Sequence, residues 1–246
     1  MRSYSSLAGV YDELTQDVDY ARRADFVERL FRRSTLPVHT VLDLACGTGT
    51  MTRILTARGY ELIAADGSEE MLMQAREKAQ GAPGIPPLFL HQQMPELDLY
   101  GTVDAAICCL DSLNYLTRPE DVRRTFRRLR LFVAPGGALV FDVHGPGRLR
   151  QLDGQVFLDE REDVYCVWRT ERRGTLLSYY MDLFRAREDG TWTREFEEHR
   201  QRFYGAEELT RWLRDVGFTD VRTYGDCRLR RPAENEERIY FCAIRK

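Results

Sequence analysis

The sequence has no long apolar segment: nowhere in its 246 residues is there a run of about 18 apolar side chains, the length of a transmembrane helix. The opening residues Met1 to Ser5 lack the apolar core of a secretory signal peptide. We therefore expect no membrane partner and a cytoplasmic location.

Cysteine is present, but it is not arranged as a metal or redox site. The six cysteines, at positions 46, 108, 109, 166, 227 and 242, include no C-x-x-C pair. Such spacing would indicate zinc or a redox dithiol. The sequence therefore predicts no metal site.

Excess charge of one sign is also missing. The net charge of -3 is close to neutral, which argues against nucleic acid as the default partner. The main local exception is the run of arginines between Arg123 and Arg130. Most such runs are the solvated face of a helix, and apolar residues recur on the opposite face here.

Strand-like and helix-like segments alternate through most of the chain. Strands are expected over residues 40–45, 60–65, 88–90, 103–110, 138–143, 218–224 and 239–244, with helices at 51–58, after Ser68, after Pro119 and at 206–216. This alternation predicts an α/β fold, with a Rossmann-like, seven-stranded, mostly parallel sheet and helices on both of its faces.

The pattern changes between residues 151 and 204, where aromatic and β-branched residues dominate. Turn signals occur at Arg173-Gly174 and Asp189-Gly190, and Asp-Gly between two strand-like runs favours a hairpin. We expect one domain formed by residues 1–150 and 205–246, interrupted by an antiparallel insertion of three or four strands. The insertion would act as a substrate lid or as the contact of a homodimer.

A glycine-rich turn follows the first strand. Gly47 and Gly49 would let a ligand approach the backbone at the carboxyl end of the sheet, and Asp66 ends the second strand, where it could accept hydrogen bonds from a ribose diol. A dinucleotide site needs a third glycine at position 52, which is Thr52. Asp43 would also repel a pyrophosphate, whereas it would favour a ligand that carries an ammonium group.

The run from Val41 to Gly49 resembles motif I of the class I S-adenosylmethionine (SAM) dependent methyltransferases. The similarity continues through Asp66, residues 103–107 and residues 131–137, and so covers about residues 38–145 by the usual extent of that family. The resemblance implies a SAM-dependent methyltransferase that releases S-adenosylhomocysteine.

The resemblance also implies a set of cofactor-binding residues. They are Tyr20, Asp43, Ala45, Gly47, Gly49, Asp66, Gly67, Met71, Gln93, Met94, Leu110 and Asp111. Gln93 stands where the family usually has an aspartate that accepts a hydrogen bond from adenine, and its amide oxygen can accept the same bond. Residues 4–20 and 111–116 are further similar to a group of bacterial methyltransferases, several of which carry a small β insertion after the fifth strand.

Two residues are candidates for catalysis. His144 follows the fifth strand, at the edge where the acceptor should meet the methyl group, and could act as a general base. Tyr115 could line the acceptor pocket, as could Tyr204. For each of them a purely structural role is the simpler interpretation. Cys46 is expected to pack beside the cofactor.

Methyl transfer from a sulfonium depends chiefly on proximity and alignment, so no catalytic triad is required. We expect a small-molecule acceptor that is methylated at N, O or C. One alternative is an RNA or protein methyltransferase that uses the basic helix Arg123–Arg130. A second alternative is a SAM-binding module without catalytic activity.

Overall fold

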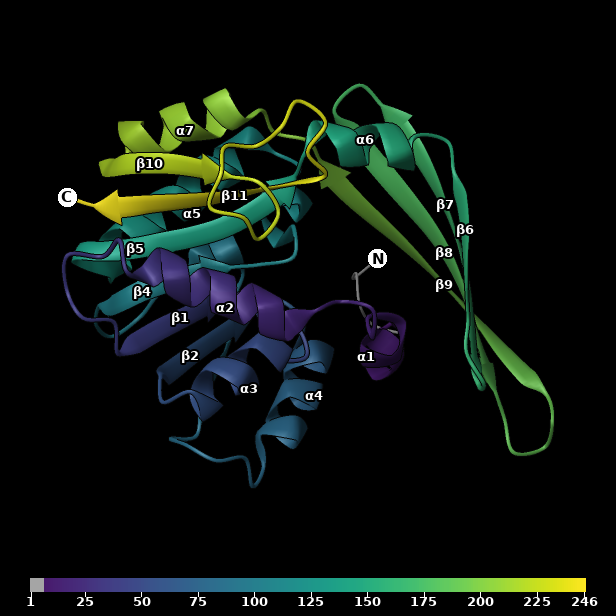
Figure 1. Ribbon diagram of the computed structural model, residues 1–246. Coiled ribbons are helices and arrows are strands. Elements are labelled where there is room, and N and C mark those ends of the chain that lie inside the picture. Colours follow the sequence, from purple (N-terminus) through teal and green to yellow (C-terminus); the bar gives the residue numbers. More distant parts are fainter. Residues whose placement is uncertain (1–6) are drawn as a thin grey trace.

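The computed structural model describes residues 7–246. Tyr4, where the N-terminal resemblance begins, and the segment Met1 to Ser5 lie outside the described residues. The first sheet consists of β1 (Thr40–Leu44), β2 (Glu61–Asp66), β3 (Leu88–His91), β4 (Val103–Cys108), β5 (Val133–His144), β10 (Phe218–Tyr224) and β11 (Arg238–Arg245). Their spatial order is β10-β11-β5-β4-β1-β2-β3 (Figure 1).

Strands β1 to β5 are mutually parallel, whereas β11 is antiparallel to both β5 and β10. This is the predicted Rossmann-like sheet of seven strands. Because the parallel strands all end at one edge, the loops that follow them meet there.

Helices cover both faces of this sheet (Figure 1). They are α2 (Tyr20–Phe31), α3 (Thr50–Ala57) and α4 (Glu69–Ala79) on one face, with α5 (Pro119–Phe132) and α7 (Ala206–Asp215) on the other. Phe26 and Leu30 of α2 are fully buried, as is Phe126 of α5, so each helix presents an apolar stripe to the strands. Ser68 caps α4 as expected, since its hydroxyl accepts a hydrogen bond from the Met71 N–H.

The structure corrects two strand boundaries and adds one helix. The fourth strand ends at Cys108, not at Leu110, because Leu110 and Asp111 take the left-handed conformation with φ of 58° and 52°. The fifth strand begins at Val133, not at Ala138, because Val133 already pairs with Val103. Helix α6 (Pro146–Leu152) was not predicted.

A separate antiparallel sheet lies entirely within the predicted insertion. It consists of β6 (Val156–Glu160), β7 (Val164–Arg173), β8 (Leu176–Ala186) and β9 (Trp192–Arg202). The turns at Arg173-Gly174 and Asp189-Gly190 join β7 to β8 and β8 to β9, as predicted. Successive side chains point to opposite faces of a strand, so Glu197, His199 and Gln201 share one face of β9, and all three are buried.

The N-terminal segment lies between the two sheets (Figure 1). It contains the short turns η1 (Ala8–Val10) and α1 (Tyr11–Leu14). The Leu7 N–H donates to Glu197 Oε1 of β9 at 2.9 Å, and Asp12 contacts the glycine loop after β1. The segment therefore connects the two sheets.

Between residues 7 and 246, no helix combines the length and the apolar character that crossing a bilayer requires.

Candidate functional site

A cavity of about 680 Å³ opens at the carboxyl ends of β1, β2 and β4. Eleven of the predicted site residues line it, namely Tyr20, Asp43, Ala45, Gly47, Asp66, Gly67, Met71, Gln93, Met94, Leu110 and Tyr115. Gly49, Asp111 and His144 are outside this lining. The volume is in the range of cofactor pockets, which is about 300–1,000 Å³.

Gly47 and Gly49 are each needed in the loop for a different structural reason. Gly47 lines the cavity with φ of +55°, a conformation that a side chain disfavours. Gly49 has φ of +76° and packs away from the cavity, where an added Cβ would be 2.9 Å from the Cβ of Ala75 on α4. Gly49 therefore permits the close approach of the loop to α4.

Asp66 fixes the loop through its own carboxylate. One oxygen accepts from the Gly47 N–H and the other from the Ser68 N–H, both at 2.8 Å. A carboxylate has about four lone-pair sites, so capacity remains for a ribose diol.

Asp43 is almost completely buried, with 2% of its surface exposed, and still lines the cavity. Burial raises the pKa of its carboxyl to about 6. Thr52 donates a hydrogen bond to Asp43 at 2.5 Å through its hydroxyl. Thr52 stands where a dinucleotide motif has its third glycine. Its hydroxyl thus orients Asp43, the acidic residue suited to a ligand ammonium.

Gln93 and Cys46 also lie at the cavity. The Gln93 amide nitrogen donates to the Gly67 carbonyl at 3.2 Å, so its amide oxygen is the group suited to accept from an adenine amine. Burial raises the pKa of the Cys46 thiol well above its ordinary value, which favours packing over nucleophilic chemistry. The residues therefore fit SAM: Asp43 suits its ammonium, Asp66 its ribose and Gln93 its adenine.

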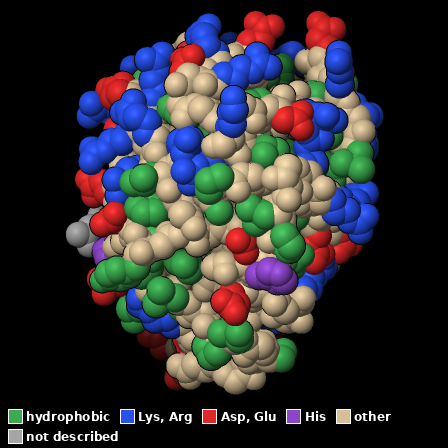
Figure 2. Space-filling view, turned by 90° about the vertical axis from the view of Figure 1, so that its left-hand side faces the viewer, with side chains coloured by type: hydrophobic (Ala, Val, Ile, Leu, Met, Phe, Trp, Pro, Cys, Tyr) green, Lys and Arg blue, Asp and Glu red, His purple; other side chains and the backbone are tan. Residues whose placement is uncertain are grey.

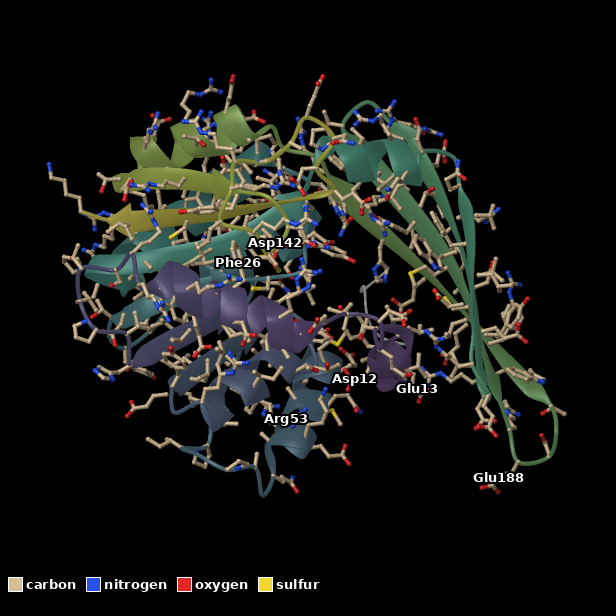
Figure 3. All side chains as sticks on the ribbon, viewed as in Figure 1. Asp12, Glu13, Phe26, Arg53, Asp142 and Glu188 are labelled. Carbon is tan, nitrogen blue, oxygen red and sulfur yellow. The ribbon has the colours of Figure 1, made fainter. Side chains whose placement is uncertain are left out.

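The left-handed turn at Leu110 and Asp111 is held by a buried charge cluster. Asp142, which is fully buried in β5 (labelled in Figure 3), accepts the Leu110 N–H at 2.8 Å and the Asp111 N–H at 3.0 Å. Arg238 of β11 bonds to Asp142 and also to Asp111, the latter at 2.6 Å. Asp111 does not line the cavity itself but holds Leu110, which does. Both residues are in the left-handed conformation, which is unfavourable for residues other than glycine.

His144 lies in the same cluster, behind the cavity. Its Nε2 is 2.8 Å from Gln201 Oε1, and its ring stacks on Phe203 with the centroids 5.5 Å apart. Burial lowers the pKa of the His144 imidazole more than the nearby Asp111 carboxylate raises it. This is the setting of a neutral, packed histidine that joins β5 to β9.

Tyr115, in the turn η3 (Ser112–Tyr115), does line the cavity. Its hydroxyl is 3.1 Å from Nδ1 of His199, and the His199 Nε2 is 2.6 Å from the Glu197 Oε2. His199 and Glu197 are both buried. Neither was identified from the sequence, where the available signal was Glu197-x-His199-x-Gln201, polar residues at the spacing of one strand face.

Helix α1 closes one side of the cavity. Tyr11 lines it, and Asp12 (labelled in Figure 3) accepts from the Thr48 hydroxyl at 2.6 Å. Lys78 of α4 pairs with the other Asp12 oxygen at 2.5 Å. The glycine loop is therefore connected to the N-terminal segment.

The arginine-rich helix α5 makes contacts within the chain. The Arg123 guanidinium lies 4.8 Å from the ring centroid of Trp212, and Arg128 pairs with Asp98 at 2.7 Å. Tyr204 is buried against the same Trp212, which corresponds to core packing. On the face shown in Figure 2, Lys and Arg side chains are interspersed with Asp and Glu.

Known proteins are similar to this chain in sequence. Residues 41–137 match the family described as "Methyltransferase domain". The "Putative methyltransferase YqeM" of Bacillus subtilis (strain 168) is 34% identical over 244 residues, which cover 98% of this chain and 96% of that protein. A glycine/sarcosine N-methyltransferase of Halorhodospira halochloris is 28% identical, with 89% and 80% covered.

The fold is shared with a solved structure. The crystal structure of a SAM-dependent methyltransferase from Clostridium acetobutylicum ATCC 824 superimposes with a TM-score of 0.88 at 28% identity, and 99% of each chain is covered. The similarity therefore includes the inserted four-stranded sheet as well as the seven-stranded sheet.

Proposed function

We propose that this chain, which belongs to the class I SAM-dependent methyltransferases, methylates the nitrogen of a small-molecule amine. The observation that carries the choice of acceptor is the charge of the cavity. Among residues 7–246, its lining includes acidic side chains and three tyrosines, Tyr11, Tyr20 and Tyr115, but no Lys or Arg. Such a site attracts a cationic amine, and it has no Lys or Arg to pair with a carboxylate or phosphate on the acceptor in addition to the carboxylate that SAM itself brings.

The cofactor residues have separate tasks under this proposal. Asp43 pairs with the ammonium group, Asp66 accepts from the ribose hydroxyls and Gln93 accepts from the adenine amine. When bound, SAM supplies a methyl group already activated for in-line displacement. The protein aligns the acceptor, excludes water and removes a proton from an amine that arrives as its ammonium form.

The relative from Halorhodospira halochloris bears the name of an N-methyltransferase, which supports nitrogen as the acceptor atom. Its named acceptors, glycine and sarcosine, carry a carboxylate. The cation-free lining described above leads us to expect that an amine without a carboxylate is preferred here. An RNA acceptor is not favoured, because phosphates would meet acidic groups at the cavity.

The experiment combines calorimetry with an assay for S-adenosylhomocysteine. SAM should bind at micromolar concentration, and ethanolamine or glucosamine should give more product than glycine or sarcosine. Tight SAM binding without product from any of these amines would favour the alternative of a non-catalytic SAM-binding module. Product from RNA alone would overturn the amine proposal.

Two further expectations remain proposals. The six cysteines are all free thiols, which agrees with a reducing compartment such as the cytoplasm. The outer face of the second sheet exposes Leu158, Trp192 and Phe196, and these side chains are where we expect the contact if the chain forms a homodimer.

A further inference from the structure

The second sheet places a buried hydrogen-bonded chain against the cavity. Tyr115 lines the cavity, and behind it stand His199 and Glu197 of β9, with only 2% and 5% of their surfaces exposed. The Tyr115 hydroxyl is 3.1 Å from Nδ1 of His199, and Nε2 of that ring is 2.6 Å from the Glu197 carboxylate. One phenol, one imidazole and one carboxylate are thus connected in a line that leads away from the reaction site.

The hydrogen-bond inventory of these groups assigns a direction to the chain. An ionised carboxylate only accepts, so the proton of the neutral imidazole belongs on Nε2, facing Glu197. Nδ1 is then the acceptor nitrogen of the ring, and the Tyr115 hydroxyl donates to it. A hydroxyl oxygen can also accept, and Tyr115 lines the cavity.

The remaining Glu197 oxygen is also engaged. It accepts the Leu7 N–H at 2.9 Å, so the carboxylate is held by the N-terminal segment as well as by His199. The Tyr115 and His199 rings meet edge to face at 5.8 Å, which fixes their relative orientation. A buried carboxylate that orients an imidazole, which in turn accepts from a hydroxyl, is the arrangement of a general base.

We propose that Tyr115, His199 and Glu197 form a proton relay that deprotonates the acceptor amine. The inference rests on the proposed function and names the residues that carry out its acid–base step. Tyr115 is the catalytic residue in this relay, because it is the member that lines the cavity, whereas His199 and Glu197 are positioning residues that act through it.

The proton balance is complete within the protein. An N–H bond of the bound ammonium breaks and its proton goes to the Tyr115 oxygen, while the Tyr115 hydroxyl proton passes to Nδ1 of His199. The amine keeps its electron pair for attack on the methyl group, and His199 becomes an imidazolium paired with the Glu197 carboxylate. His199 returns that proton to solvent by the reverse path after the product leaves.

This relay differs from the role that the sequence suggested for His144. The His144 Nε2 is 2.8 Å from Gln201, and the ring does not line the cavity. His199 is the histidine that is connected to the cavity through a hydroxyl.

The first test reads the relay without any acceptor. Nitrogen-15 NMR of histidine-labelled protein saturated with S-adenosylhomocysteine should show His199 with its proton on Nε2 and Nδ1 as a hydrogen-bond acceptor. Tyr115→Phe should shift the Nδ1 resonance, and Glu197→Gln should shift the Nε2–H proton upfield. A proton on Nδ1 of His199 at neutral pH would overturn the relay, because Nδ1 could then not accept from Tyr115.

The second test uses the amine of the panel above that wild type methylates fastest. Tyr115→Phe should lower kcat about 100-fold, within the usual range for a general base, and His199→Gln should lower it about 10- to 100-fold. The Kd for SAM should stay within about twofold. The matched controls are Tyr180→Phe, on the outer face of β8, and His39→Gln, which is exposed.

The pH profile separates a relay from simple packing. The relay requires the His199 Nδ1 to accept from Tyr115, so with saturating acceptor the wild-type profile of kcat against pH should contain an acid limb that depends on His199. The His199→Gln variant should have a lower kcat, and its pH profile should lack that acid limb. Among residues 7–246, the titratable groups near His199 are Glu197 on its own strand, Tyr179 on β8, Tyr115 on η3, and Tyr11 and Asp111 beyond Tyr115.

The outcomes are distinct. If wild type turns over an amine and His199→Gln keeps both its rate and its acid limb, the relay is wrong while the proposed function stands. If wild type methylates none of the amines although it binds SAM, the proposed function fails, and the relay fails with it.

Discussion

At the edge of the seven-stranded sheet, the polar groups that line the cavity come from the carboxyl ends of strands and the turns that follow them, as with Asp43, Asp66 and Gly47. On the four-stranded sheet, the polar groups behind the cavity come from one face of a single strand, and His199 and Glu197 of β9 are connected to the cavity through Tyr115. The turns lie next to each other because parallel strands end together, and their chemistry can be inferred from spacing. The side chains on this face of β9 reach the cavity only through η3, against which the strand packs. Under the proposed function, the first sheet supplies the donor half of the site, with Asp43 and Asp66, and the second sheet supplies the acceptor half, with His199 and Glu197.

The largest expected effect is at the junction of the two halves. Asp142→Ala should lower the free energy of unfolding by about 3–5 kcal/mol, because it leaves Arg238 buried without its partner in β5. The turn at Leu110 and Asp111 would also lose the acceptor of its two N–H groups. Chemical denaturation measures the change, and Asp98→Ala, which breaks an exposed pair with Arg128, should cost less than about 1 kcal/mol. Similar values for the two variants would show that the two halves do not depend on this cluster.

The next effect should be confined to the donor half. Asp43→Asn should weaken SAM binding about 30- to 100-fold, the equivalent of about 2–3 kcal/mol for a charge-assisted contact. The unliganded variant should nevertheless be more stable at pH 8, by about 1–3 kcal/mol, because burial penalises the ionised form. Calorimetry and urea denaturation measure the two quantities. Glu197→Gln, in the acceptor half, is the comparison and should leave the Kd for SAM within about twofold; an equal loss in both variants would contradict the division.

The same carboxyl sets a pH dependence of binding. The pKa of Asp43 is raised to about 6, so the folded protein holds a proton that the unfolded chain has already released between pH 3.8 and about 6. Its contribution to stability is therefore present at low pH and is lost as pH rises through that window. SAM binding should change in the opposite direction, with the Kd rising up to tenfold per pH unit below about 6. Titrations at pH 5, 6 and 7 test this, and a Kd for Asp43→Asn with the same slope would exclude Asp43 as the cause.

The donor half could be predicted because its signals are local. The Gly47-x-Gly49 turn, Asp43 and Asp66 lie in one βαβ unit, where chain order fixes spatial order. Even there, the sequence could not show that Gly49 packs on Ala75 while Gly47 lines the cavity, because that distinction depends on how closely α4 approaches.

The acceptor half could not be predicted in the same way. Tyr115 and His199 are separated by 84 positions and meet only because β9 packs against η3. His144 was a candidate because it was expected to follow the fifth strand, but its ring stacks on Phe203, which directly follows β9 and is distant in sequence. A charged residue in an apolar strand, such as Asp142, was a signal available in the sequence, but its partner Arg238 is 96 positions away.

The smallest expected effect tests whether the two halves communicate. Asp12 belongs to the N-terminal segment that contacts both, and its carboxylate is about half exposed, so its bonds to Thr48 and Lys78 should contribute about 0.5–1 kcal/mol. Asp12→Ala should therefore speed SAM release about two- to fivefold in stopped-flow measurements, whereas Asp17→Ala, at an exposed pair with Arg161, should not. If kcat also falls in Asp12→Ala, the segment transmits order from the glycine loop to Glu197 through Leu7. An unchanged kcat would mean that the donor and acceptor halves share a cavity but are held independently.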